Sequence, residues 1–444
     1  MIGIMLRAGL IVAALFAISP ALSQSGPSPE AGHAQELTVD LNGDCISDNS
    51  AILQQAVRAA GTTATPTSRT RINVGPASNG CYVFASPVTL ESNIELQALG
   101  TVVFRSAGTS LLVKGQSNIV VKGFTFDGQS NKNKIYAPTI SVANSHHVSL
   151  IDLTIVNAIG QINLRDDDHI LIQSPVVHDS LQHGVSMNNT YDSSVIDGDF
   201  EREVGFGIYL YNGSHDNLIM GNRTTQNGLE LVGATQDTFQ NRIARNHAEG
   251  TGDNCISVSG SDTLVENNEA IGCAGNGIGI YGERNVVTGN TIKNNAQKRA
   301  KQVSWRAGIA VVPAFGGVGQ FNKVSGNVVS DDQAIPTQRI GVWLSATFYD
   351  SWTAHKPYKA GSYAFNELAL YKAEQDGTSG ATAPACLAGS CSDGSLAWRF
   401  VRTLQAGNAL ADYNAISSNK FGTAVQRSYL DQSGALHNSF AEDR

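Results

Sequence analysis

The feature that most constrains this chain is an alternating apolar strand that returns after each small Asn- or Gly-containing turn. Its first inward residue falls at Ile162, Val185, Ile208, Leu229, Ile256, Ile278, Ile309 and Val342. The strand is again apolar two positions later in every repeat. Such units bury their inner face only by stacking on one another, which is typical of a solenoid. We therefore predict an all-β right-handed parallel β-helix, because a two-sheet sandwich does not explain the fixed alignment.

The first residues have the pattern of an export signal. Arg7 supplies a positive start, residues 8–18 are apolar, and Ala21 and Ser23 are the small residues that precede cleavage. We expect a signal peptide over residues 1–23 and a secreted or periplasmic protein. The alternative, a retained membrane anchor, requires a longer apolar run. Residues 24–37 are rich in Ser, Pro and Gly and predict a disordered leader.

Charge and cysteine content exclude some functions. Charged residues make up 15% of the chain and the formal net charge is −8, so nucleic acid is not an expected partner. No segment after the signal is apolar enough to cross a membrane, so no membrane partner is expected. The six cysteines fall into three neighbouring pairs that suit disulfides in an exported protein, namely Cys45 with Cys81, Cys255 with Cys273, and Cys386 with Cys391. Their spacing does not suit a metal site, and none is expected.

One helix precedes the β region. Asp48 or Ser50 can cap its start, and Gly61 can end it. Its apolar face would consist of Ile52, Leu53, Ala56, Val57 and Ala60. An open stack exposes an apolar end and unpaired strand edges, so we expect this helix to cap the first coil.

The repeat divides the chain into regions. Residues 38–350 are expected to form the β-helix. Residues 351–403 lack the repeat but contain aromatic residues, Gly and short strands, and predict a small inserted β module. Residues 404–444 return to the coil pattern and would add terminal coils and a tail.

Residues 38–105 resemble the opening of the pectate-lyase-like β-helix superfamily, which implies the architecture but no single activity. The phase of the later turns is similar to that of polygalacturonases, family 28 of the glycoside hydrolases. Asn227, Asn254 and Asn276 stand where that family has Asp, Asp and His, and only Asp253 remains of the acid set. Ala310 and Val312 lie where the family has Arg and Lys. The resemblance therefore implies the frame without pectin hydrolysis.

The inserted segment resembles small aromatic carbohydrate-binding modules found in chitinases and other polysaccharide-degrading enzymes. The matching pieces are Tyr358 to Gly361, Leu370 to Ala373, Gly377 to Gly380, Ala383-Pro384 and Asp393 to Trp398. Trp352, Tyr358, Tyr371 and Trp398 would form either its binding face or its core.

Candidate catalytic residues come from the outward positions of the coils. One residue after each first inward position, the outward column reads Asn163, Ser186, Tyr209, Glu230, Ser257, Gly279, Ala310 and Trp343. Glu230 is its single carboxylate, and Asp253 lies on the next coil, so the two form a candidate acid pair. His183, in a turn, is a third catalytic candidate. The alternatives are a solvated Glu230, an Asp253 that caps its turn, and a His183 that binds backbone.

Substrate binding is expected from outward aromatic and cationic residues. Aromatic faces pack on sugar C–H surfaces, and guanidinium groups neutralise uronate carboxylates. The substrate-binding candidates are Tyr209, Tyr211, Tyr281, Arg306, Arg339 and Trp343. No cofactor is expected, except that Asp166 to Asp168 could hold Ca²⁺ in place of forming a solvated turn.

These features favour a secreted carbohydrate-active protein, a glycoside hydrolase or polysaccharide lyase acting on an extracellular polysaccharide. The losses at the polygalacturonase positions favour the alternative, a non-catalytic glycan-binding or surface protein on the same scaffold. An epimerase or fructan transferase is a third class without residue evidence. A homotrimer is one assembly that such scaffolds form.

Overall fold

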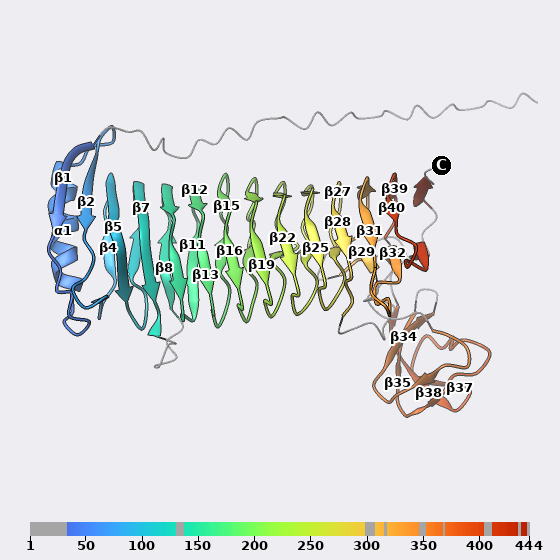
Figure 1. Cartoon of the computed structure of the whole chain (residues 1–444). Helices are drawn as coiled ribbons and strands as arrows, with labels where there is room; N and C mark the ends of the chain where they lie inside the picture. Colours follow the sequence, from blue (N-terminus) through green and yellow to red (C-terminus); the bar gives the residue numbers. More distant parts are fainter. Residues whose placement is uncertain are drawn as a thin grey trace, which may run out of the picture.

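The computed structural model describes residues 33–129, 137–297, 307–314, 318–345, 352–366, 369–403, 411–433 and 437–441. Figure 1 shows one long stack of parallel coils, with a helix at the N-terminal end and a small β module beside the last coils. The prediction of a parallel β-helix with a capping helix and an inserted module is confirmed. In the described part of the chain, no helix combines the length and the hydropathy that a membrane span requires.

One wall of the stack is a sheet of 12 parallel strands. Its strands are β4 (Val88–Leu90), β6 (Leu111–Lys114), β8 (Pro138–Ala143), β11 (Gly160–Arg165), β14 (Val185–Asn188), β17 (Ile208–Tyr211), β20 (Val232–Ala234), β23 (Ile256–Val258), β26 (Ile278–Ile280), β29 (Ala307–Val311), β32 (Ile340–Ser345) and β41 (Arg427–Gln432). Seven of the eight inward positions predicted from the repeat pair with one another in register. The exception is Leu229, because Val232 pairs with Ile208 and Ile256.

The other walls belong to a sheet of 24 strands. They are β1 (His33–Val39), β2 (Arg69–Val74), β3 (Tyr82–Val83), β5 (Ile94–Arg105), β7 (Ser117–Asp127), β9 (His146–Ile151), β10 (Thr154–Val156), β12 (Asp168–Gln173), β13 (Val176–His178), β15 (Ser194–Ile196), β16 (Asp199–Glu201), β18 (Leu218–Met220), β19 (Arg223–Thr225), β21 (Arg242–Ala244), β22 (His247–Glu249), β24 (Leu264–Glu266), β25 (Glu269–Ile271), β27 (Val286–Thr288), β28 (Thr291–Lys293), β30 (Lys323–Ser325), β31 (Val328–Ser330), β39 (Ala415–Ser417), β40 (Lys420–Phe421) and β42 (Ser439–Ala441). Their inward aliphatic residues join those of the first wall in one continuous core.

Buried asparagines fix the corners between these walls. Asn222, Asn246, Asn268, Asn290, Asn327 and Asn419 form a ladder, in which each side-chain oxygen accepts from the side chain and backbone of the preceding Asn. The residue before each ladder position has a positive φ, as at Gly221 and Arg245. The Asn side chains satisfy buried backbone groups, while the residues before them make the left-handed bend.

The helix α1 (Ser50–Thr63) covers the first coil, as Figure 1 shows. The N-cap residue is Asn49, which was not predicted, while Asp48 before it accepts from the backbone and hydroxyl of Ser50. Two further details of the prediction are wrong. Ile52 is 39% exposed and does not belong to the buried face, and the helix continues past Gly61.

The predicted leader also needs a correction. Strand β1 (His33–Val39) pairs in parallel with β2, so residues 33–37 are ordered as part of the first coil. The predicted signal peptide and the remainder of the leader lie outside the described residues.

The inserted segment forms sheets of its own. Strands β34 (Tyr363–Asn366), β35 (Ala369–Ala373), β37 (Ser390–Asp393) and β38 (Leu396–Thr403) are antiparallel, and β33 (Pro357–Tyr358) pairs with β36 (Gly377–Thr378). Tyr358, Tyr371 and Trp398 are buried in its core. Trp352 packs against that core and donates to Asp393 at 2.7 Å. Of the two alternatives for these aromatic residues, the structure supports the core.

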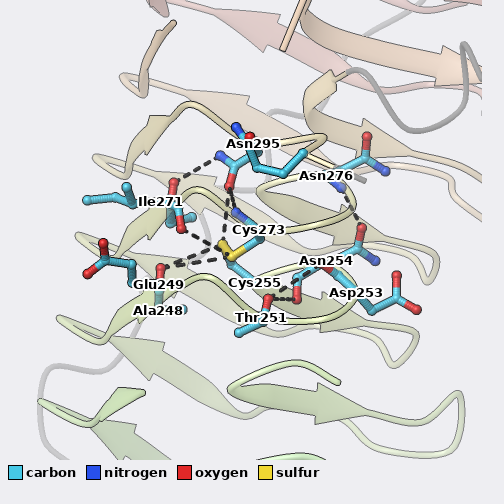
Figure 2. The surroundings of a disulfide bond; sticks show 12 residues. Ala248, Glu249, Thr251, Asp253, Asn254, Cys255, Ile271, Cys273, Asn276 and Asn295 are labelled. Carbon is cyan, nitrogen blue, oxygen red and sulfur yellow. Dashed lines mark hydrogen bonds between the residues drawn. A yellow bond between two sulfur atoms is a disulfide. The ribbon is translucent and has the colours of Figure 1, made fainter. Parts of the chain in front are cut away.

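The three expected cysteine pairs form disulfides. Cys255, just before β23, bonds Cys273 in the corner that closes the same coil, and both are fully buried. Figure 2 shows this disulfide between two turns, with the side chain of Asp253 directed away from it. The bond therefore staples one coil of the stack from inside.

Candidate functional site

The outer face of the 12-stranded sheet changes character along the stack. The outward column of paired residues reads Leu112, Ser141, Asn163, Ser186, Tyr209, Gly233, Ser257, Gly279, Ala310 and Trp343. Positions from Leu112 to Tyr209 are partly exposed, and we name this stretch the open half. Positions from Gly233 to Trp343 are buried, and we name them the covered half.

A groove of ≈ 520 Å³ lies on the open half. Its lining comes from four successive coils and comprises Asn163, Leu181, Gln182, His183, Ser186, Val204, Gly205, Tyr209, Tyr211 and Leu229. Because neighbouring coils are ~4.8 Å apart, the groove extends about 14 Å along the stack. It brings together three residues predicted from the sequence, namely His183, Tyr209 and Tyr211.

An aromatic stack forms one wall of this groove. Phe206 stacks on Tyr209 with ring centroids 4.6 Å apart, and Tyr211 stacks on Tyr209 at 4.8 Å. Phe206 and Tyr211 therefore both pack against the Tyr209 ring, and Tyr211 is the last ring of the stack. Burial raises the pKa of Tyr209, with further contributions from Tyr211, Asp237 and Glu230, so its hydroxyl stays protonated at neutral pH.

His183 is held in one orientation beside this stack. Its ring lies 4.9 Å from that of Tyr209, and its Nδ1 accepts the backbone N–H of Phe206 at 3.1 Å. Burial lowers the pKa of His183, so the imidazole is neutral at neutral pH. A neutral imidazole whose Nδ1 accepts carries its proton on Nε2. His183 is therefore built to donate a hydrogen bond from Nε2 and not to remove a proton there.

Glu230 does not lie in the outward column, which corrects its predicted position. It precedes strand β20 in a turn, and Gly233 takes the column position beside Tyr209. The Glu230 side chain is buried and accepts from the Ser257 hydroxyl at 2.6 Å. Asn254 donates to that hydroxyl at 3.0 Å and to the Tyr281 hydroxyl at 2.7 Å. Glu230 is therefore part of a buried polar cluster, and the alternative of a solvated surface charge is wrong.

Tyr281 and Trp343 are buried, so the expectation that they offer exposed faces to sugar is wrong. Tyr281 lies back over Gly279, and Trp343 donates to Gln432 at 2.9 Å. Both belong to a second apolar cluster on the covered half, with Ala307, Ala310, Val312 and Ile340. Burial raises the pKa of Tyr281, which keeps its hydroxyl neutral.

The remaining candidates lie apart from the groove. Asp253 is one residue out of register with Glu230 on the next coil, and its charge contributes to the raised pKa of Tyr281. Arg339 donates to the carbonyl of Pro336 just before β32. Strand β32 is five strands from β17, so Arg339 lies about 24 Å from the groove along the stack. Arg306 lies outside the described residues.

The Asp166 to Asp168 turn uses its carboxylates within the protein. Asp167 is fully buried and accepts from the backbone of Ser145 and Arg165, and burial raises its pKa to about 7. Asp166 accepts from Asn189, and Asp168 binds His169 and Tyr191. Within the described ranges, no group of three or more His, Cys, Asp or Glu is placed to hold a metal ion. A Ca²⁺ site here remains an expectation.

Sequence reasoning missed the residues that shape the groove. Phe206 lies over Gly233, where a Cβ would come within 2.4 Å of the ring. Leu181 and Val204 form an exposed apolar rim at 52% and 60% exposure. The sequence does contain a signal for this contact: Gly233 occupies the outward column, and Phe206 precedes the adjacent strand. The alignment at Leu229 put Glu230 in the column in place of Gly233, so the signal was missed.

The three Asn residues at the positions of the polygalacturonase motifs form hydrogen bonds with backbone groups. Asn254 accepts the backbone N–H of Asn276, and Asn276 accepts that of Ala307. Asn227 accepts the backbone N–H of Glu203. These amides act as corner ladders in place of acids.

The chain has the fold of a right-handed parallel β-helix. Residues 108–310 match the sequence model of a family described as "Periplasmic copper-binding protein (NosD)". No curated protein matches the sequence.

Solved structures share the fold over nearly the whole chain. The A-module of the Azotobacter vinelandii mannuronan C-5 epimerase AlgE4 is 14% identical, covers 92% of this chain and 100% of its own, and has a TM-score of 0.60. The AlgE6 A-module from the same organism is 14% identical with the same coverage and a TM-score of 0.56. ORF18 of Geobacillus virus E2 is 13% identical, covers 82% of this chain and 76% of its own, and has a TM-score of 0.50.

Proposed function

We propose that this chain is an exported, polysaccharide-active β-helix protein that binds glycan in the groove of the open half. The observation that carries the proposal is the stack ending in Tyr211, set in a groove that follows the stack axis. Asn163, Gln182 and Ser186 add hydrogen-bonding side chains along it, and His183 adds an Nε2 donor. An elongated groove with one aromatic wall and spaced polar groups suits a chain of sugars.

The chemistry of the groove favours binding over hydrolysis. Glycosidases place two carboxyl groups about 5–10 Å apart on either side of the bond that they cleave. None of the described lining residues is a carboxylate. Glu230 is buried and does not line the groove, and one of its oxygens accepts from Ser257. A glycoside hydrolase with Glu230 and Asp253 as its acid pair is therefore the weaker form of the proposal.

A second candidate is proton-transfer chemistry on a uronate-containing polymer, as in a lyase or an epimerase. The ring of Tyr209 lies beside that of His183, and its hydroxyl is neutral, so this phenol can act as a general acid. His183 would serve as the base only if its Nδ1 bond to Phe206 were broken. This candidate therefore predicts a movement of the turn that carries His183 when substrate binds.

The proposal includes a periplasmic or extracellular location. It is supported by the signal pattern of residues 1–23, by three disulfides, and by the periplasmic description of the matching family. Copper is not part of it, because the described residues offer no suitable cluster of ligands.

A binding and turnover panel tests the proposal. The purified mature protein is titrated calorimetrically with mannuronan, pectate, xylan and chitin oligosaccharides, and the products are assayed for new reducing ends and for unsaturated uronates. We expect binding to at least one glycan that is lost in His183→Ala and kept in His215→Ala, a matched histidine on a different corner. Absence of binding and turnover across the panel contradicts the proposal. Full activity in both Glu230→Gln and Asp253→Asn excludes the hydrolase form.

A further inference from the structure

The outer face is open on one side of the groove and closed on the other. Towards the N-terminal coils the column continues with the partly exposed Ser141 and Leu112. In the other direction Gly233 is buried, Ser257 is 7% exposed, and Trp343 is fully buried. A ligand along the axis can leave the groove over Ser141 but cannot pass Gly233.

The closed side is a built wall. Phe206 crosses from its turn onto the next coil and rests on Gly233, which has no side chain to displace it. Behind it lie the buried Glu230 and Ser257, joined by a hydrogen bond. Tyr281 folds back over Gly279 of its own coil, and its hydroxyl accepts a hydrogen bond from Asn254 of the preceding coil. Two aromatic rings thus lie on either side of this buried polar cluster, which belongs to the covered half.

We infer that the groove is blind and binds the end of a glycan chain. The inference rests on the proposed function and adds that recognition occurs at a terminus, with the terminal sugar beside Phe206 and Tyr209 and the rest of the chain leaving over Ser186, Asn163 and Ser141. A groove open at both ends would bind internal stretches of a polymer, and each long chain would then carry several protein molecules. A blind groove accepts one protein per available end.

Stoichiometry separates the two modes. Size-fractionated oligosaccharides of the panel glycan that binds, beginning with mannuronan and pectate, are titrated into the full mature protein. We expect a constant number of protein molecules per chain as chain length increases, so that capacity per gram of polymer falls with length. Capacity proportional to polymer mass would overturn the inference while leaving the proposed function intact. Absence of binding by every panel glycan would overturn both.

A variant at the open side provides a second test. Ser141→Trp places a large side chain where the glycan leaves the groove. We expect about a tenfold loss of affinity for long oligosaccharides and an unchanged affinity for the shortest one that binds. Ser194→Trp, the same exchange at a partly exposed position of β15 on another wall, serves as the control. Equal effects of Ser141→Trp on short and long oligosaccharides, with an unchanged circular dichroism spectrum, would overturn the inference.

Discussion

The open and covered halves of one sheet face have the same backbone register but different environments. Tyr209 and Trp343 occupy equivalent outward positions five strands apart. Tyr209 lines a groove, whereas Trp343 lies in an apolar cluster with Ala310 and Ile340. The repeat determines the direction in which a side chain points, and the surroundings of that side chain decide whether it binds a ligand or stabilises the fold.

The corners of the two halves differ in a similar way. In the covered half, the corner that closes a coil holds Cys273, bonded to Cys255. The hydrogen bonds that join successive corners place Glu203 at the matching point of the open half. Its side chain is 1% exposed, and among the described residues no side chain donates a hydrogen bond to its two carboxyl oxygens. The corner of the open half that contains Glu203 is therefore less stable than the disulfide-bonded corner of the covered half.

Removing the Trp343 indole from the covered half should cause the largest loss of stability. Trp343→Ala removes a fully buried ring and is expected to lower the free energy of unfolding by about 3–5 kcal/mol. Denaturant unfolding checks this, with Trp343→Phe as the control that keeps most of the bulk. A loss below about 1 kcal/mol would mean that the cluster does not stabilise the coils.

The buried acid of the open half should make stability depend on pH. Burial raises the pKa of Glu203 to about 8 from 4.5, so the folded protein holds the proton more tightly than the unfolded chain. The protonated Glu203 carboxyl makes its full contribution to the free energy of unfolding below pH 4.5. That contribution is lost as the pH rises to about 8. At pH 7 the loss would be roughly 3 kcal/mol.

Glu203→Gln should remove this dependence and raise stability more at pH 8 than at pH 5. Urea unfolding at the two pH values measures the difference. Glu201→Gln, on the partly exposed end of β16, is the control and should leave the pH dependence in place. Parallel curves for the wild type and Glu203→Gln would mean that burial does not raise the pKa of the Glu203 carboxyl.

The boundary between the halves can be disturbed at one glycine. In Gly233→Ala the new Cβ would lie 2.4 Å from the Phe206 ring, so the ring must move. We expect a loss of about 1–3 kcal/mol in stability, as for other overpacked sites, together with weaker glycan binding. Gly108→Ala is the control, because no atom lies within 4 Å of the position that its new methyl group would take. An unchanged melting temperature in both variants would contradict a fixed wall.

Much of the fold could be predicted from the sequence, because stacking forces apolar residues to recur in step. The prediction failed where the recurrence was ambiguous: Leu229 and Leu231 imitate a strand start, but hydrogen bonding selects Val232. The sequence pattern also could not show that Trp343 is buried, because the residue paired beside it is Leu430, which is distant in the chain. His183, Tyr209 and Tyr211 were found because turns and outward positions of adjacent coils necessarily meet.

The smallest expected change in stability accompanies a large change in binding. Tyr211 ends the aromatic stack on the open half and is only partly buried, so Tyr211→Ala should change the free energy of unfolding by about 1 kcal/mol or less. Loss of a sugar-stacking face should weaken glycan binding about tenfold, the equivalent of ~1.4 kcal/mol. Calorimetric titration and thermal melting measure the two quantities on the same sample. Tyr191→Ala removes a ring that stacks on His215 at a different corner, and it should leave binding unchanged. If Tyr211→Ala and Tyr191→Ala bind glycan equally well, the open half is not the binding face, and its difference from the covered half concerns stability alone.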